Sequence, residues 1–209
     1  MTAPYVYVDG FNLCYRAVKD TPYKWLNIAE MCRRLLPRND VVKIKYFTAW
    51  ISGSTYPDKP LRQRTYLRAL STLPNVEIVF GQFLSHSRRM PLAYPVRGGP
   101  RTVEVLHTEE KGSDVNIAAR MVHDAHCGRF AAAVLISNDS DLCEPVRIVR
   151  DEVKLPVGIV YPSLRGHPSR VLVRNATFVK QIRAGLLQAC QFPQQLKDAS
   201  GVIRKPSAW

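Results

Sequence analysis

The chain has 209 residues, 46% of them hydrophobic, which excludes a disordered chain and suits one α/β domain that buries a core without disulfides or structural metals. Its 30 basic and 17 acidic residues give a formal charge of +13. Such an excess indicates a polyanionic partner, with nucleic acid favoured over an anionic membrane because no amphipathic basic helix with a wide apolar face stands out. A basic protein without such a partner is the alternative.

Strand and helix patterns alternate along the first 80 residues. Residues 5–8 are continuously apolar, which is typical of a strand buried on both faces of a sheet. The predicted elements are strands at 5–8, 41–50 and 76–80, a helix through 25–35 that Pro37 stops, a turn at 56–58 and a very basic helix through 61–70.

The alternation continues in the second half of the chain. Residues 85–100 are rich in Arg, Pro and Gly and are predicted to form an irregular loop. Beyond them we expect strands at 102–108, 132–137 and 156–161, helices that open at 112–114 and near Asp141, and a last helix within 177–187. Strands that alternate with helices predict a three-layer α/β/α domain with a mainly parallel sheet.

We assign residues 1–188 to this domain and residues 189–209 to a C-terminal tail. The tail lacks periodicity, and we expect it to pack on the domain, with docking to a partner or to the second subunit of a homodimer as the alternative. The N-terminus has no signal-like segment, no stretch approaches membrane-spanning length, and the five cysteines form no C-x-x-C pair. The sequence therefore predicts a cytoplasmic protein that does not enter a membrane.

Carboxylates follow three of the predicted strands directly. They are Asp9 after residues 5–8, Glu110 and Asp114 after 102–108, and Asp139 and Asp141 after 132–137. In an open α/β sheet, ligands bind outside the carboxyl ends of the strands, so these acids should meet at one edge. Clustered carboxylates repel one another unless a cation holds them, and hard oxygen ligands favour Mg²⁺ or Mn²⁺ over zinc.

Helix capping explains some of these acids without any metal. Asp141 forms a capping-box pattern with Glu144, and Asp114 is an anion in a first helical turn. Capping does not explain Asp9, where the chain leaves a buried strand, or Asp139. These two are therefore the strongest predicted metal ligands, with Asp114 and then Asp141 behind them.

Three segments resemble the signature motifs of the NYN family, whose LabA-like members belong to the PIN-like nuclease superfamily. They are residues 8–12 (VDGFN), 109–115 (EEKGSDV) and 136–142 (ISNDSDL), and they occur in the order typical of the family. The resemblance covers residues 5–180 in broad terms. It implies a Rossmann-like, PIN-like fold and a metal-dependent ribonuclease that acts in RNA processing or decay.

Carried over by position, the resemblance also implies residue roles. Catalytic and metal-binding roles fall on Asp9, Asp114, Asp139 and Asp141, and supporting roles on Asn12, Ser137 and Lys111, the last as a phosphate contact. Many relatives carry a further Asp where this chain has Arg120, so one metal or two stays open, and Glu110 is a candidate substitute. The predicted activity is endonucleolytic cleavage of RNA by metal-activated water.

Basic side chains outside the motifs are predicted to contact RNA. They are Arg88, Arg89, Arg97 and Arg101, which accompany Tyr94 in the basic loop, and Arg165. A solvated surface loop is the alternative for these residues. At the level of function, a catalytically weak or inactive RNA-binding NYN module also stays open, whereas the lack of a D-x-D pattern disfavours a phosphatase that uses Asp9 as nucleophile.

Overall fold

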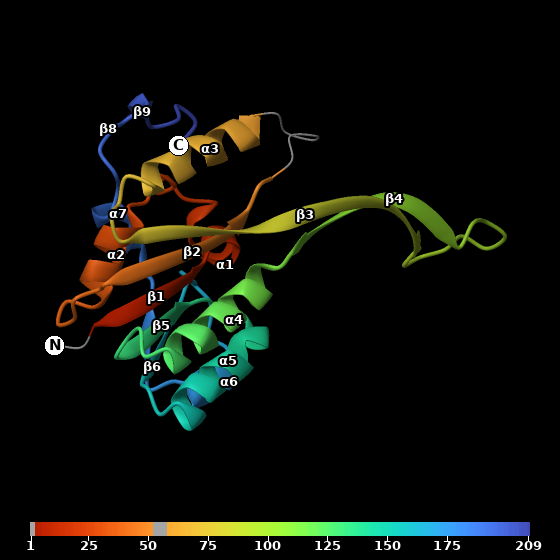
Figure 1. The fold of residues 1–209 in the computed structure, drawn as a ribbon. Coiled ribbons are helices and arrows are strands. Elements are labelled where there is room, and N and C mark those ends of the chain that lie inside the picture. Colours follow the sequence, from red (N-terminus) through yellow and green to blue (C-terminus); the bar gives the residue numbers. More distant parts are fainter. Residues whose placement is uncertain (1–2, 52–57) are drawn as a thin grey trace.

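A seven-stranded sheet forms the centre of the protein (Figure 1). The computed structural model describes residues 3–51 and 58–209. The strands are β1 (Pro4–Asp9), β2 (Lys43–Ala49), β3 (Val76–Pro91), β4 (Thr102–Lys111), β5 (Ala132–Ile136), β6 (Val157–Tyr161) and β7 (Phe178–Gln181). Their order is β4-β3-β2-β1-β5-β6-β7, and all neighbours are parallel except β3 and β4. The predicted mainly parallel sheet is confirmed.

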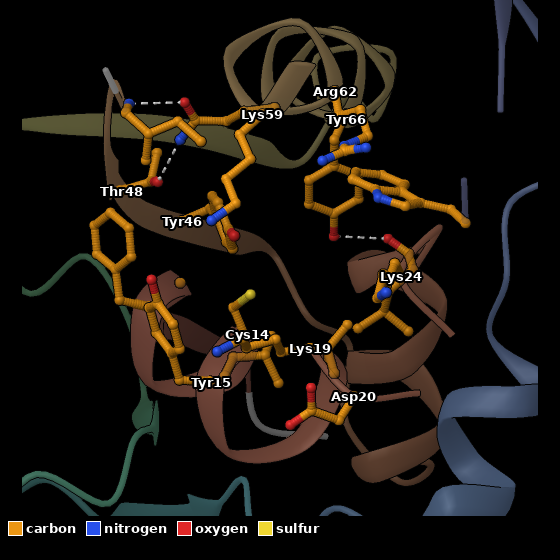
Figure 2. A pocket seen from close by; sticks show the side chains of 18 of the residues that line it. Cys14, Tyr15, Lys19, Asp20, Lys24, Tyr46, Thr48, Lys59, Arg62 and Tyr66 are labelled. Atoms are coloured by element: carbon orange, nitrogen blue, oxygen red, sulfur yellow. Dashed lines mark hydrogen bonds between the residues drawn. The ribbon is translucent and has the colours of Figure 1, made fainter. Parts of the chain in front are cut away.

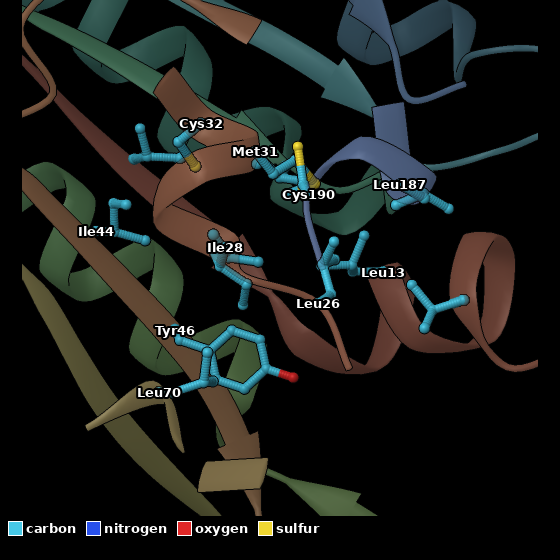
Figure 3. Close-up of a cluster of buried hydrophobic side chains, with 14 of the residues drawn as sticks. Leu13, Leu26, Ile28, Met31, Cys32, Ile44, Tyr46, Leu70, Leu187 and Cys190 are labelled. Atoms are coloured by element: carbon cyan, nitrogen blue, oxygen red, sulfur yellow. The ribbon is translucent and has the colours of Figure 1, made fainter. Parts of the chain in front are cut away.

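Helices cover both faces of this sheet. They are α1 (Gly10–Leu13), η1 (Cys14–Val18), α2 (Ile28–Leu35), α3 (Asp58–Leu70), α4 (Ser113–His126), η2 (Ser140–Leu142), α5 (Cys143–Arg147), η3 (Ile148–Glu152), α6 (Arg170–Asn175) and α7 (Ala184–Ala189). On one face α2, α3 and α7 pack against Val6 and Val8 of β1. Figure 3 shows part of this cluster, with Ile28 of α2, Leu70 of α3 and Leu187 of α7. On the other face α4, α5 and α6 pack against Tyr7. Successive strand residues point to opposite faces, so the continuous apolar run is buried on both sides.

The chain turns into a helix directly after β1, earlier than the sequence pattern predicts. The segments α1 and η1 follow Asp9 at once, and α2 begins only at Ile28 because the Asn27 side chain accepts the Glu30 N–H at 3.0 Å. Trp25 therefore precedes the helix in which we placed it, and its buried indole donates to the Pro193 carbonyl at 2.8 Å. Most of the turn predicted at 56–58 falls outside the described residues.

Beyond the sheet, β3 and β4 continue as a long two-stranded antiparallel arm (Figure 1). The pairing runs from Gln82 opposite Lys111 to Pro91 opposite Thr102. The irregular loop predicted at 85–100 is therefore wrong for residues 85–91. Solvent reaches both faces of the arm, so no apolar alternation marks these residues as a strand.

The last residues fold back over α3 as a hairpin of β8 (Gln195–Asp198) and β9 (Gly201–Arg204). Arg68 of α3 donates two hydrogen bonds to the Asp198 carboxylate. The Trp209 ring lies 6.1 Å from that of Trp25 and 5.9 Å from that of Tyr66, between centroids. These contacts hold the end of the chain against α3 and Trp25. The domain boundary at residue 188 stays a prediction. Among the described residues, no helix has the length and apolarity that crossing a membrane requires.

Candidate functional site

Asp9 lies at the carboxyl end of β1, and its side chain is held on both oxygens. One oxygen accepts the Asn12 N–H and the other accepts the Ser137 hydroxyl, each at 2.9 Å. The first bond makes Asp9 the N-cap of α1, so the prediction that capping does not explain this acid is wrong. Burial raises the pKa of Asp9, the two hydrogen bonds oppose that rise, and the charges of Asp139 and Glu110 add to it.

The loop after β5 is tied to the same place by short hydrogen bonds. The Ser137 hydroxyl accepts the Asp139 N–H, and the Asn12 side chain accepts the Asn138 N–H, both at 3.1 Å. Asp139 in turn accepts the Asp141 N–H at 3.1 Å and is the N-cap of η2. The capping role predicted for Asp141 is therefore wrong, and so is the prediction that capping does not explain Asp139, because Asp139 performs this role.

Asp114 opens α4 and joins the cluster from the third strand end. Partial burial and repulsion by Asp9, Asp139, Glu110 and Asp141 raise its pKa to about 6. Every charged neighbour that perturbs this carboxyl is another acid. The structure thus brings the predicted acids together at one edge of the sheet, close enough for each to oppose the ionisation of Asp114.

Glu110 enters this edge because Gly81 of β3 leaves room for its carboxylate. A Cβ at Gly81 would lie 2.6 Å from the Glu110 carboxylate, and that carboxylate accepts the Ser113 N–H at 3.1 Å. Arg120 does not face the acids as a replacement for one, since its guanidinium contacts Glu77 of β3 at 3.0 Å. The extra acid near Asp114 in this chain is therefore Glu110.

The chemistry of the acids fits a hard divalent cation, although their side chains do not enclose one. Carboxylates from three strand ends offer oxygen ligands, and their mutual repulsion would fall on binding a cation. Within residues 3–51 and 58–209, however, no three His, Cys, Asp or Glu side chains are grouped so that they could hold a metal ion. Metal binding would therefore require carboxylates of this edge to move closer together.

A model of the NYN domain matches residues 5–183. The chain belongs to the NYN family. It is 28% identical over 98% of its length to 6-hydroxy-3-succinoylpyridine 3-monooxygenase HspA of Pseudomonas putida, 74% of which the match spans. A solved structure from Vibrio parahaemolyticus, of a protein of unknown function, matches with a TM-score of 0.57 at 16% identity, over 88% of this chain and 94% of that one. That likeness supports the Rossmann-like fold, and NYN membership suggests nuclease-like activity on RNA.

Basic groups of this NYN domain lie both on the arm and beside the acids. Arg88, Arg89, Arg97 and Arg101 are exposed on the arm or its tip, as is Tyr94, which is 93% exposed. Lys111, predicted to contact phosphate, pairs with Glu109 at 3.1 Å between Nζ and the carboxylate. Arg165 is exposed on the loop that follows β6.

Asn138 ties the loop after β5 to the loop after β6, a role that the sequence analysis did not predict. Its side chain donates to the His167 carbonyl at 3.2 Å and accepts the Ser169 N–H at 2.6 Å. Because Arg165 belongs to the same loop, Asn138 holds that arginine's segment next to the acidic edge. Its place in the third motif, residues 136–142, is the feature of the sequence that could have indicated this role.

Proposed function

We propose that this NYN domain is a metal-dependent endoribonuclease. The observation that carries the proposal is the convergence of Asp9, Asp114, Asp139 and Asp141 on one edge of the sheet, where burial and the charges of the neighbouring acids raise the pKa of Asp114 to about 6. A carboxylate cluster with this degree of repulsion favours binding of a divalent cation. When bound, Mg²⁺ or Mn²⁺ would acidify a water ligand and neutralise the scissile phosphate.

The chain's own residues have separate tasks in this proposal. Asp9 is fixed by Asn12 and Ser137, so it is preorganised as a ligand rather than free to rotate. Asp114 has a pKa of about 6, so its carboxyl is ionised at neutral pH and can serve as a second ligand. Arg165 lies on the loop that Asn138 anchors and would hold a phosphate beside the acids.

The arm extends the surface available to RNA well beyond the acidic edge (Figure 1). Arg88 and Arg89 on β3, with Arg97 and Arg101 in the connection between the two strands, can neutralise successive phosphates. The exposed Tyr94 ring can stack on an unpaired base. This arrangement favours single-stranded or locally unpaired RNA as the substrate class. Binding through the arm should weaken steeply as salt concentration rises.

A panel of metals and substrates tests the proposal. We expect the purified protein to cleave single-stranded RNA with Mn²⁺ or Mg²⁺, and to lose that activity with EDTA or with Asp139→Asn. The variant prepared in parallel controls for contaminating nuclease. Cleavage that persists at the same rate in the variant, or that requires no divalent ion, would overturn the assignment.

Activity should also depend on pH through Asp114. Its pKa of about 6 means that the carboxyl is neutral below that pH and binds cations weakly there. Affinity for Mn²⁺, measured by calorimetry from pH 5 to 7, should fall by about tenfold for each pH unit below the pKa, because one proton competes with the ion. An affinity that stays constant over this range would show that Asp114 is not a ligand.

An RNA-binding module without catalysis is a second candidate, favoured because the acids do not enclose an ion as they stand. It predicts salt-sensitive RNA binding without turnover under any divalent ion. The likeness to HspA over 98% of the chain favours a third, oxygenation of a small heteroaromatic acid. That activity would consume oxygen together with a two-electron donor, because one oxygen atom must leave as water.

A further inference from the structure

A cavity of about 470 Å³ opens beside α1, the helix that begins directly after Asp9. Gly10 and Phe11, the two residues after that acid, form part of its wall. Figure 2 shows side chains of η1 on one side of the cavity and of α3 on the other. Its size lies within the range of small-molecule sites, about 300–1,000 Å³.

Aromatic rings make up much of the interior. Tyr46 of β2 and Tyr66 of α3 lie edge to face, 6.4 Å apart between centroids, and Trp209 completes this wall. The Tyr66 hydroxyl donates to the Leu26 carbonyl at 2.9 Å, so that the ring rather than the hydroxyl is offered to an occupant (Figure 2). Burial raises the pKa of Tyr46, which keeps its phenol neutral. Flat apolar walls of this kind suit a planar ring.

The mouth of the cavity is strongly basic. Of the described residues that line it, four are basic, namely Lys19, Lys24, Lys59 and Arg62, whereas Asp20 is the one acid. The Lys19 ammonium lies 5.1 Å from the centroid of the Tyr15 ring. Lys24 and Arg62 take part in none of the ion pairs found among residues 3–51 and 58–209. The electrostatic field at the mouth therefore favours an anion.

We propose that this cavity binds a small planar aromatic molecule that carries an anionic group. The ring would pack against Tyr46, Tyr66 and Trp209, while the anionic group would reach Arg62 and Lys24 at the mouth. An aromatic carboxylate and a mononucleotide share this chemistry. The site needs no metal and uses none of the clustered acids, so it does not rest on the proposed nuclease activity.

Ligand-observed NMR with the full chain in EDTA tests the site. Two matched pairs of probes are used: nicotinate with nicotinamide, and uridine 5′-monophosphate with uridine. We expect the anionic member of at least one pair to bind at least about tenfold more tightly than its neutral partner, as one charge-assisted contact allows. Binding by nicotinate alone identifies the ligand as a carboxylate, and binding by the monophosphate alone identifies it as a nucleotide.

Variants locate the binding site. Arg62→Met should reduce the affinity for the anion to that of the neutral probe, and Arg62→Lys should retain part of it. Arg64→Met is the matched control, because Arg64 is exposed on the same helix and does not line the cavity. The proposal is overturned if no probe binds, if charged and neutral probes bind equally, or if the control loses as much affinity. The probes are measured in EDTA and without RNA, so this result does not depend on the nuclease proposal.

Discussion

Asp9→Asn is expected to lower metal-dependent RNA cleavage by at least about 100-fold without unfolding the protein. A metal ligand contributes several kcal/mol to the transition state, and each 1.36 kcal/mol corresponds to a factor of about ten in rate. The asparagine can still accept the Asn12 N–H, and its amide can donate to the Ser137 hydroxyl oxygen. The substitution therefore removes the negative charge while the local hydrogen bonds can be kept.

Single-turnover cleavage with saturating RNA measures this effect, and thermal unfolding checks the fold. Asp151→Asn is a suitable control, since Asp151 pairs with Arg150 in η3, which leads into β6 at the opposite edge of the sheet. It removes the same charge from the protein and should retain full activity. If Asp9→Asn cleaves RNA as fast as this control, the acidic edge is not the catalytic site.

The sheet and its acidic edge were predictable because both follow from short-range patterns. Continuous apolar runs mark strands buried on two faces, and the rule that ligands bind beyond the strand ends places Asp9 and Asp139 together. The arm was not predictable in this way, because no core faces residues 85–91 and their composition is typical of a loop. Pairing with β4 alone makes them a strand.

Capping was assigned to the wrong acid because the local sequence pattern does not show the contact that Ser137 makes in the folded chain. The pattern from Asp141 to Glu144 describes a capping box, but Ser137 holds the Asp139 N–H and turns that residue toward the start of η2. The cavity was hidden altogether, because η1, α3 and Trp209 come together only in the folded chain. Residues that meet across such distances in sequence leave no periodic signal.

Asp124 gives the clearest case of a buried group that the sequence did not reveal. It lies in the last turns of α4 and is fully buried, where it accepts hydrogen bonds from Tyr7 at 2.7 Å and Arg129 at 2.8 Å and forms an ion pair with Lys45. Lys45 of β2 is only 4% exposed, and lysine side chains are rarely buried to this extent unless they are paired. These contacts join α4 to the first two strands of the sheet.

Asp124→Asn should therefore destabilise the fold by about 3–5 kcal/mol, because it leaves the Lys45 ammonium buried without a counter-charge. Tyr7→Phe, which removes one neutral donor from the same carboxylate, should cost only about 1 kcal/mol. Urea unfolding of the two variants beside the parent at pH 7 measures both values. Equal losses would mean that the hydrogen bond, not the charge pair, dominates.

The pH dependence of the stability lost in Asp124→Asn shows which charge causes the loss. Burial raises the pKa of Asp124, but three donors outweigh it and hold the pKa below its usual value of 3.8. The stabilisation is therefore complete above that pH and is lost as the pH falls through the lower pKa of the folded state. The gap in unfolding free energy between the parent and Asp124→Asn should accordingly be constant from pH 7 to pH 5 and shrink only in stronger acid. A gap that closed already near pH 6 would show that the charge of Asp124 does not account for the difference in stability.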